Sequence, residues 1–326
     1  GGSAPIYASH LFQSDLIGVD ETRIAPNKAL ARRTQAQFGI GLTPDERISL
    51  GCGPGDRPMQ GLGAGYLPPS QLVAEDQEID LDGVVAQFLL CGGETADHMA
   101  VWLPEHKVLF CGDNWYHAFP NLYAIRGTPY RDYEVWADSL DRLSALEAEV
   151  LVPGHTRPVF GKDAVRQVLE TTRDAIMHVM RFTAEAMDAG MSPEEIASRI
   201  ELPAELRDLP WLQEYYGKVG WSARAYAAGT LGWYDGNPTN LGTLTEEVRA
   251  RHLSELAGGE EALLQAAHST GDPQWRLELC DTLLALGWPA AGLKAKTLRE
   301  LAETEINATA RNTYLFEAGK LDQQGD

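Results

Sequence analysis

Residues 84–114 read VVAQFLLCGGETADHMAVWLPEHKVLFCGDN. Three apolar runs in this stretch, at 84–90, 99–103 and 108–111, have the length expected of strands in a buried sheet. Residues 105–107, between the second and third runs, fit the short connection of a hairpin. Polar residues that include Gly, Asp and His follow the first and third runs. The stretch therefore predicts a sheet whose strand ends carry side chains capable of chemistry.

Strand-like and helical segments alternate on both sides of this stretch up to residue 161. Residues 6–8 resemble a strand, and residues 27–38 and 133–147 carry the periodicity of helices. Such alternation is typical of layered α/β architectures, and it predicts an α/β unit over residues 1–161.

From residue 162 onward the pattern is almost wholly helical. Ser192-Pro193-Glu194-Glu195 is a helix start, because it combines an N-cap residue, a Pro in the first turn and acidic first-turn residues. Residues 232–240 are rich in Gly, Pro and Asn and predict an ordered loop that returns to the active site. The fold class is thus predicted as α/β followed by all-α, with residues 162–326 as the second unit. Further helices are expected at 163–186, 246–256, 260–269, 272–286 and 289–308.

Composition narrows the classes of function. A length of 326 residues with 44% hydrophobic content is enough for a large core. A formal charge of −20 makes nucleic acid a poor partner, although a local Arg or metal ion can still attract an anionic substrate. No stretch approaches the roughly 20 apolar residues of a membrane span. The four cysteines lack CxxC spacing, so we expect free thiols rather than a zinc knuckle.

Three strand-to-turn segments carry candidate metal ligands. His98 ends the segment 92–98, Asp113 follows the apolar run 108–111, and His155 follows a strand-like Leu151-Val152-Pro153. Ligands gather at strand ends in layered α/β folds, so these side chains are expected in one crevice. Imidazole nitrogens and a carboxylate able to bridge two ions suit zinc-like cations. Each residue alone also has an ordinary interpretation as a surface, turn or capping residue.

The order of these residues resembles the metallo-β-lactamase superfamily, in which HxHxDH is followed by a His, a bridging Asp and a final His. The resemblance implies His98 as a ligand of the first ion, Asp113 as the bridge and His155 as a ligand of the second. It also implies two zinc ions and an αββα sandwich. Binding by neutral His and ionised Asp should weaken on acidification.

Longer strings are similar to the alkyl sulfatase branch in particular. They are residues 114–131, which include Asn121-Leu122-Tyr123-Ala124-Ile125-Arg126-Gly127, residues 214–217 and residues 231–238. In that branch the helical region is a dimerisation domain and a lipid-carrier-like domain follows, so the resemblance implies a homodimer.

Two features depart from the family pattern. No two of the eight histidines are spaced as HxH, so HxHxDH is absent and residues 1–161 are expected to form only the C-terminal part of the sandwich. We expect the missing motif to precede Gly1 or to come from a separate N-terminal segment, and the compartment stays unknown. Trp221 also stands where the detergent sulfatases carry a substrate-facing His, which leaves the exact substrate open.

The resemblance and the residue chemistry together suggest roles around the metals. Glu94 is expected to orient the imidazole of His98, or else to be a solvated or capping residue. Arg126 is the expected sulfate clamp and a catalytic residue with Asp113, because its planar fork matches a tetrahedral oxyanion. The alternative for Arg126 is an ion pair with Asp132 or Glu134.

The remaining candidates concern the substrate. Asn114 and Asn121 are candidate neutral donors to the sulfate, and Tyr123 is a site or packing residue. Trp221 and Trp233, with Tyr234, either line a channel for an alkyl chain or belong to a helical core.

The leading hypothesis is a metal-dependent hydrolase that cleaves alkyl sulfate esters to an alcohol and inorganic sulfate. One alternative is another hydrolase of the same fold that acts on a phosphoester, a thioester or a lactone. The other is a dimerising fragment without catalysis of its own.

Overall fold

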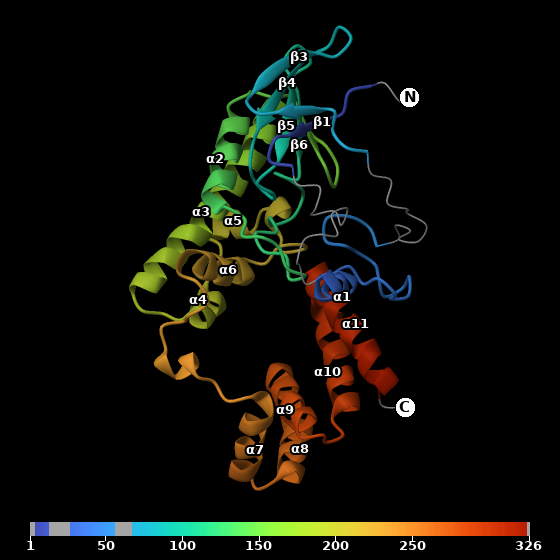
Figure 1. Cartoon of the computed structure of the whole chain (residues 1–326), viewed down its shortest axis with the longest axis vertical. Coiled ribbons are helices and arrows are strands. Elements are labelled where there is room, and N and C mark those ends of the chain that lie inside the picture. The colour runs from blue at the N-terminus through green and yellow to red at the C-terminus, as the bar shows by residue number, and fades with distance from the viewer. Residues whose placement is uncertain (1–3, 13–26, 56–66, 325–326) are drawn as a thin grey trace.

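The computed structural model describes residues 4–12, 27–55 and 67–324 of the chain (Figure 1). A six-stranded sheet with the order β3-β4-β5-β6-β7-β8 forms the first unit. All neighbouring strands are antiparallel except β6 and β7, which are parallel. The strands are β3 (Gln77–Asp80), β4 (Val85–Leu90), β5 (Met99–Leu103), β6 (Val108–Gly112), β7 (Val150–Pro153) and β8 (Val159–Phe160).

One face of this sheet packs against two helices, α2 (Tyr133–Ser144) and α3 (Lys162–Asp188). Asp132 caps α2, since its side chain accepts a hydrogen bond from the backbone N–H of Val135. Side chains alternate across each strand, so every second residue faces the helices. The shared core contains residues of the strands and of both helices, namely Ala100, Trp102, Leu109, Cys111, Leu151, Trp136, Leu140, Val165 and Leu169.

A small parallel pair of strands, β1 (Tyr7–Ser9) and β2 (Gln71–Val73), belongs to a second cluster of apolar residues. Val73 is buried with Ala86 and Phe88 of β4, and the Tyr7 ring packs edge-on against the Phe88 ring at 5.0 Å. The strand predictions at 6–8, 84–90, 99–103 and 108–111 are confirmed to within about a residue.

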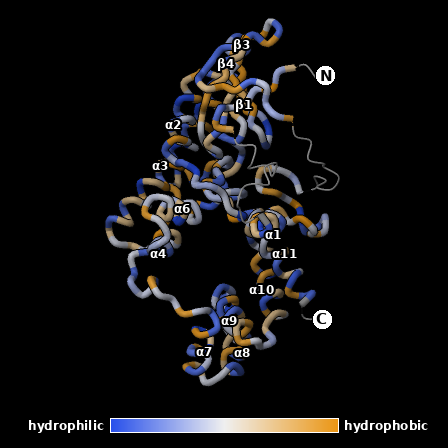
Figure 2. Tube along the Cα trace, in the orientation of Figure 1, coloured by the Kyte–Doolittle hydropathy of each residue, from blue (hydrophilic) through white to orange (hydrophobic). Residues whose placement is uncertain are grey.

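The second unit is helical, which confirms the fold class of α/β followed by all-α. Figure 2 shows apolar positions interleaved with hydrophilic ones along its helices, as expected of helices that bury one face. Its elements after α3 are α4 (Pro193–Arg199), α5 (Ala204–Arg207), η2 (Pro210–Leu212), α6 (Val219–Leu231), η3 (Pro238–Leu241), α7 (Glu246–Ala257), α8 (Glu260–Ser269), α9 (Pro273–Ala285), α10 (Ala291–Thr304) and α11 (Ala308–Gln324).

The helix start at Ser192 is confirmed as a reciprocal capping box with Glu195. The single helix expected over residues 289–308 is wrong, because α10 ends at Thr304 and α11 begins at Ala308. Asn307 makes the break: its Oδ1 accepts from the backbone N–H of Ala310 at 3.0 Å. Its amide group donates to the carbonyl of Glu214 at 2.8 Å and to two neighbouring carbonyls. A distant segment therefore determines where α11 begins.

The last helix, α11, packs beside the first helix, α1 (Asn27–Gln37), as Figure 1 shows. Asn312 of α11 donates to the carbonyl of Ser49 at 3.0 Å, and Arg311 donates to the carbonyl of Glu46. The boundary at residues 161–162 stays a prediction. It coincides with the start of α3, although α3 shares its core with the sheet. Within the described ranges, the helices are too short or too polar to span a membrane.

Candidate active site

Four strand ends meet at one edge of the sheet, and this edge carries the predicted chemistry. Strands β4, β6 and β7 end there, and β5 begins there, because β4 and β6 are each antiparallel to β5 while β7 is parallel to β6. The turn 92–98, the residues after β6 and the residues after β7 therefore converge. The sheet topology brings together the three segments that the sequence predicted to share a crevice.

Asp113 and His155 are in direct contact at this edge. The Oδ1 atom of Asp113 lies 2.6 Å from the Nδ1 atom of His155. The two turns are tied by a backbone hydrogen bond from Gly154 to the carbonyl of Gly112 at 2.7 Å. A β-carbon on Gly154 would lie 2.6 Å from the carboxylate of Asp113, so only glycine permits this approach. Both side chains are partly exposed and so are accessible to a ligand.

His98 has a contact that differs from its predicted role. Its Nε2 atom accepts the backbone N–H of Asp113 at 3.0 Å. A neutral imidazole has one nitrogen with a free lone pair, so the Nδ1 atom then carries the proton and has no lone pair to offer a metal ion. Burial lowers the pKa of His98, which favours this neutral form, although Asp113 and Asp97 oppose the effect. In this geometry His98 supports the backbone of Asp113, and its role as a metal ligand stays a prediction.

Glu94 does not orient His98, because no hydrogen bond joins them among the described contacts. One carboxylate oxygen of Glu94 lies 3.2 Å from a guanidinium nitrogen of Arg131, and the other accepts the hydroxyl of Tyr116 at 3.0 Å. Burial raises the pKa of Glu94, Arg131 opposes this, Asp113 adds to it and His155 opposes it. The carboxylate of Glu94 thus lies within electrostatic range of Asp113 and His155.

The donor chemistry at this edge fits a divalent cation. Two carboxylates and an imidazole are common zinc ligands, and a cation would relieve the repulsion between Glu94 and Asp113. Across residues 4–12, 27–55 and 67–324, no group of three or more His, Cys, Asp or Glu side chains is arranged to hold a metal ion by itself. Asp113, His155 and Glu94 thus have the donor chemistry of metal ligands, but they do not form a complete site among the described residues.

Asn114 and Asn121 are buried, and their contacts are mainly structural. The side chain of Asn114 donates to the carbonyl of Cys91 at 2.9 Å and lies so close to Gly93 that a β-carbon there would collide with it. Asn121 is held by its backbone: its N–H donates to the Tyr116 hydroxyl at 2.7 Å, and its carbonyl accepts from Arg131. The side-chain Nδ2 atom of Asn121 is buried and has no hydrogen-bond partner among the described residues, and the role of both Asn residues as donors to the sulfate stays a prediction.

Arg126 lies on a loop that α1 supports. Its backbone N–H donates to the Oε1 atom of Gln37 at 2.9 Å, and its guanidinium donates to the carbonyl of Gly127 at 2.9 Å. No ion pair joins Arg126 to Asp132 or Glu134 in the part of the chain that the structure describes. Most of the donors of this partly exposed guanidinium therefore remain available for an anion.

Tyr123 and Trp221 line one hollow of about 340 Å³, beside the Arg126 loop. Its other lining residues are Ile125, Arg224, Ala225 and Ala228, so the walls are mainly apolar. Trp233 does not join it. About 15 Å of α6 separates Trp221 from Leu231, and Trp233 follows at the far end, 77% exposed and stacked edge-on with Tyr234. The loop 232–240 therefore leads away from the hollow toward α7 in this chain.

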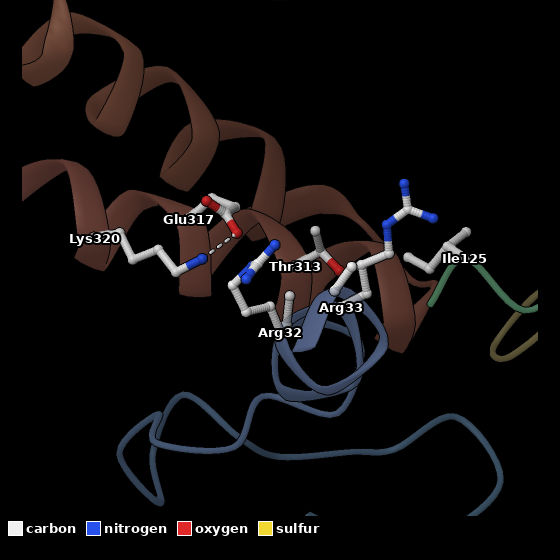
Figure 3. A pocket seen from close by; sticks show the side chains of 8 residues that line it. Arg32, Arg33, Ile125, Thr313, Glu317 and Lys320 are labelled. Atoms are coloured by element: carbon white, nitrogen blue, oxygen red, sulfur yellow. Dashed lines mark hydrogen bonds and ion pairs between the residues drawn. The ribbon is translucent and has the colours of Figure 1, made fainter. Parts of the chain in front are cut away.

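Ile125 also borders a second hollow, of about 320 Å³, between α1 and α11 (Figure 3). Arg32 and Arg33 of α1 line it together with Lys320 of α11, which is paired with Glu317 at 2.8 Å. In Figure 3 the guanidinium of Arg33 extends toward Ile125. The loop that carries Arg126 thus has an apolar hollow on one side and a basic one on the other.

Sequence reasoning missed Gln37, Tyr116 and Arg131. No motif marks Gln37, which lies 89 residues before the Arg126 N–H that it accepts, and Tyr116 was noted only as part of the string 114–131. Arg131 was noted only as the end of a family string, because a buried arginine looks the same in a sequence as a surface one. Its position directly before the Asp132 cap of α2 is the only local signal.

Comparison with known proteins gives matches over both units. Residues 21–155 match the model of the metallo-beta-lactamase superfamily, and residues 192–324 match that of the alkyl sulfatase dimerisation family. A linear primary-alkylsulfatase of Pseudomonas sp. (strain ATCC 19151) is 32% identical over 98% of the chain and 62% of its own length. An (R)-specific secondary-alkylsulfatase of Pseudomonas sp. is 30% identical, over 98% of the chain and 50% of its own length.

Solved structures agree with these relatives. The stereoselective inverting secondary alkylsulfatase Pisa1 from Pseudomonas sp. superposes with a TM-score of 0.84 at 27% identity, over 99% of the chain and 52% of that protein. A double mutant of the same enzyme gives a TM-score of 0.89 at 29% identity. The chain spans about half to three fifths of the length of these relatives. The predicted combination of a metallo-β-lactamase-like sheet unit and an alkyl sulfatase dimerisation region is confirmed.

Proposed function

We propose that the chain, which is similar to alkyl sulfatases of the metallo-β-lactamase superfamily over both of its units, serves the hydrolysis of alkyl sulfate esters to an alcohol and inorganic sulfate. The observation that carries the proposal is the contact of Asp113 with His155 at one sheet edge, with Glu94 within electrostatic range of both. The Arg126 loop adds an anion-binding group with most of its donors available. A hydrolase that acts on a charged ester needs both a site that activates water and a group that binds the anion.

Asp113, His155 and Glu94 are the proposed metal-holding residues of this chain, with zinc as the proposed ion. A bound divalent ion would lower the pKa of water enough to supply hydroxide near neutral pH. His98 is assigned the separate task of holding the backbone of Asp113 through the hydrogen bond to its Nε2 atom. The completion of the ligand set by an HxHxDH segment remains a prediction.

Arg126 and the hollow next to it are proposed to bind the two ends of the substrate. The guanidinium fork suits a sulfate group, whose oxygens accept two parallel hydrogen bonds. The apolar walls formed by Tyr123, Trp221 and Ile125 suit an alkyl chain, which gains free energy on leaving water. Head group and tail would then be fixed on the same loop, a short distance from the sheet edge.

Residues 192–324 are proposed to form a homodimer, because they match the alkyl sulfatase dimerisation family. An isologous dimer is the commonest arrangement for homo-oligomers.

The direct test is sulfate release by the purified full-length protein from octyl sulfate, with and without a chelator. We expect release that the chelator abolishes and that added Zn²⁺ restores. A parallel panel of a phosphoester, a thioester and a lactone covers the other hydrolytic activities of the fold. Turnover of a panel member with no sulfate release from metal-loaded protein would reject the substrate assignment. Inactivity on every compound would favour a non-catalytic role.

The ligand assignment makes a prediction about Glu94 and His98. Glu94→Gln should weaken Zn²⁺ binding by about 10–100-fold, because a neutral amide is a poorer ligand than a carboxylate. His98→Gln should retain Zn²⁺ within about threefold, since the Gln carbonyl can still accept the Asp113 N–H. Competition with a chromophoric chelator measures both affinities. The reverse ranking, with His98→Gln losing the metal, would restore His98 as the ligand.

A further inference from the structure

Arg131 is an unusual side chain for the interior. It is 5% exposed, and it is the only charged residue that is buried among the described residues. A buried charge is costly unless it is paired and hydrogen-bonded. Arg131 is paired with Glu94 at 3.2 Å and donates to the backbone carbonyl of Asn121. One guanidinium thus binds a carboxylate at the sheet edge and the backbone of the loop that leads to Arg126.

Tyr116 makes the same two connections through a single hydroxyl. It donates to the second carboxylate oxygen of Glu94 at 3.0 Å and accepts the backbone N–H of Asn121 at 2.7 Å. Both oxygens of Glu94 and both backbone groups of Asn121 are therefore bound by the pair Arg131 and Tyr116. Tyr116 is itself buried, and its ring packs edge-on against the ring of Tyr216 at 5.6 Å.

We propose that Arg131 and Tyr116 are positioning residues that set the metal-holding carboxylate and the sulfate-binding loop in one arrangement, an inference that rests on the proposed function. Arg126 lies only five residues after Asn121, and its own N–H is fixed by Gln37 at the other end of this segment. The segment 121–126 is thus anchored at both ends. Arg131 and Tyr116 each bind both Glu94 and the backbone of Asn121, so a shift of Glu94 is transmitted to Asn121.

Such coupling has a functional consequence. Catalysis requires reacting groups to be held to within a fraction of an ångström, and misplacement far from the chemistry can lower rates about 10²-fold. A pair that only stabilised the fold would affect the unfolding temperature alone. A pair that positions both sides of the site affects metal affinity and KM for the sulfate ester together.

The test compares Tyr116→Phe with Tyr133→Phe in the full-length protein. Tyr116→Phe removes both hydrogen bonds and keeps the ring, so the variant should fold. We expect Zn²⁺ affinity, measured by chelator competition, to fall about 10–100-fold, as for other groups that orient a ligand. KM for octyl sulfate should rise at least about threefold. Tyr133 is the matched control for the metal measurement, because its buried hydroxyl contacts the carbonyls of Ser222 at 3.0 Å and Leu122 at 3.4 Å but does not contact Glu94.

Equal Zn²⁺ affinity and KM in the two variants, with only the unfolding temperature changed, would overturn the inference. Arg131→Lys is a second variant, in which one ammonium replaces the planar fork; like Tyr116→Phe, it should lower the Zn²⁺ affinity and raise KM. The Zn²⁺ measurement needs no substrate. If Tyr116→Phe loses Zn²⁺ affinity while the unmodified protein releases no sulfate, the substrate assignment is rejected. The positioning of Glu94 by Tyr116 is then still supported.

Discussion

Replacing Arg126 by Ala is expected to lower kcat/KM for octyl sulfate by about 10²–10³-fold, the scale seen when one donor to a developing negative charge is removed. The reason is that its guanidinium leaves most of its donors unused by the described residues and lies on the loop whose residues Tyr123 and Ile125 line the apolar hollow. Metal content should not change, because Arg126 contacts none of the proposed metal-holding residues. Sulfate release and metal analysis on the same preparation check both statements.

Two variants sharpen this test. Arg126→Lys keeps the positive charge and loses the planar fork, so it should recover only part of the lost activity. Arg166→Ala is the control for the loss of an arginine: Arg166 of α3 is ion-paired with Asp163 at 3.1 Å and does not line the hollow, so its loss should change kcat/KM by less than about threefold. Loss of metal from Arg126→Ala would show that the residue supports the metal site instead of the substrate.

Replacing Asp113 by Asn is expected to lower kcat on the order of 10³–10⁴-fold. Losses of this size are typical when one member of a group of residues that act together in catalysis is removed. The Asn side chain has nearly the same shape and can still accept from His155, so the fold should be preserved. The lost charge weakens metal binding, and a large excess of Zn²⁺ should restore part of the activity by mass action. Metal content and sulfate release, each titrated with Zn²⁺, measure this.

Asp138→Asn is the control for the loss of one negative charge, because Asp138 is exposed on α2. It should leave both metal content and activity unchanged. Full activity of Asp113→Asn at ordinary Zn²⁺ concentrations would remove Asp113 from the proposed metal site.

Much of the fold follows from local pattern. The runs that became β4, β5 and β6 were visible as short apolar segments between glycines and polar turns, since a buried strand needs apolar residues over only five or six positions. Helix starts such as Ser192 were visible because capping is local chemistry. The break between α10 and α11 was missed, because Asn307 takes its partners from residues 214–217, far away in the chain.

The candidate site divides in the same way. The sequence by itself determined that Asp113 and His155 follow strands, and that donors of the zinc type lie near one sheet edge. Only the tertiary structure decided which nitrogen of His98 is engaged, that Glu94 binds Arg131 and Tyr116, and that α6 separates Trp233 from Trp221. The physical reason is that spacing along the chain specifies where a residue lies on its strand or helix. The contacts of its side chain depend on partners such as Arg131 and Tyr116, which packing brings from elsewhere.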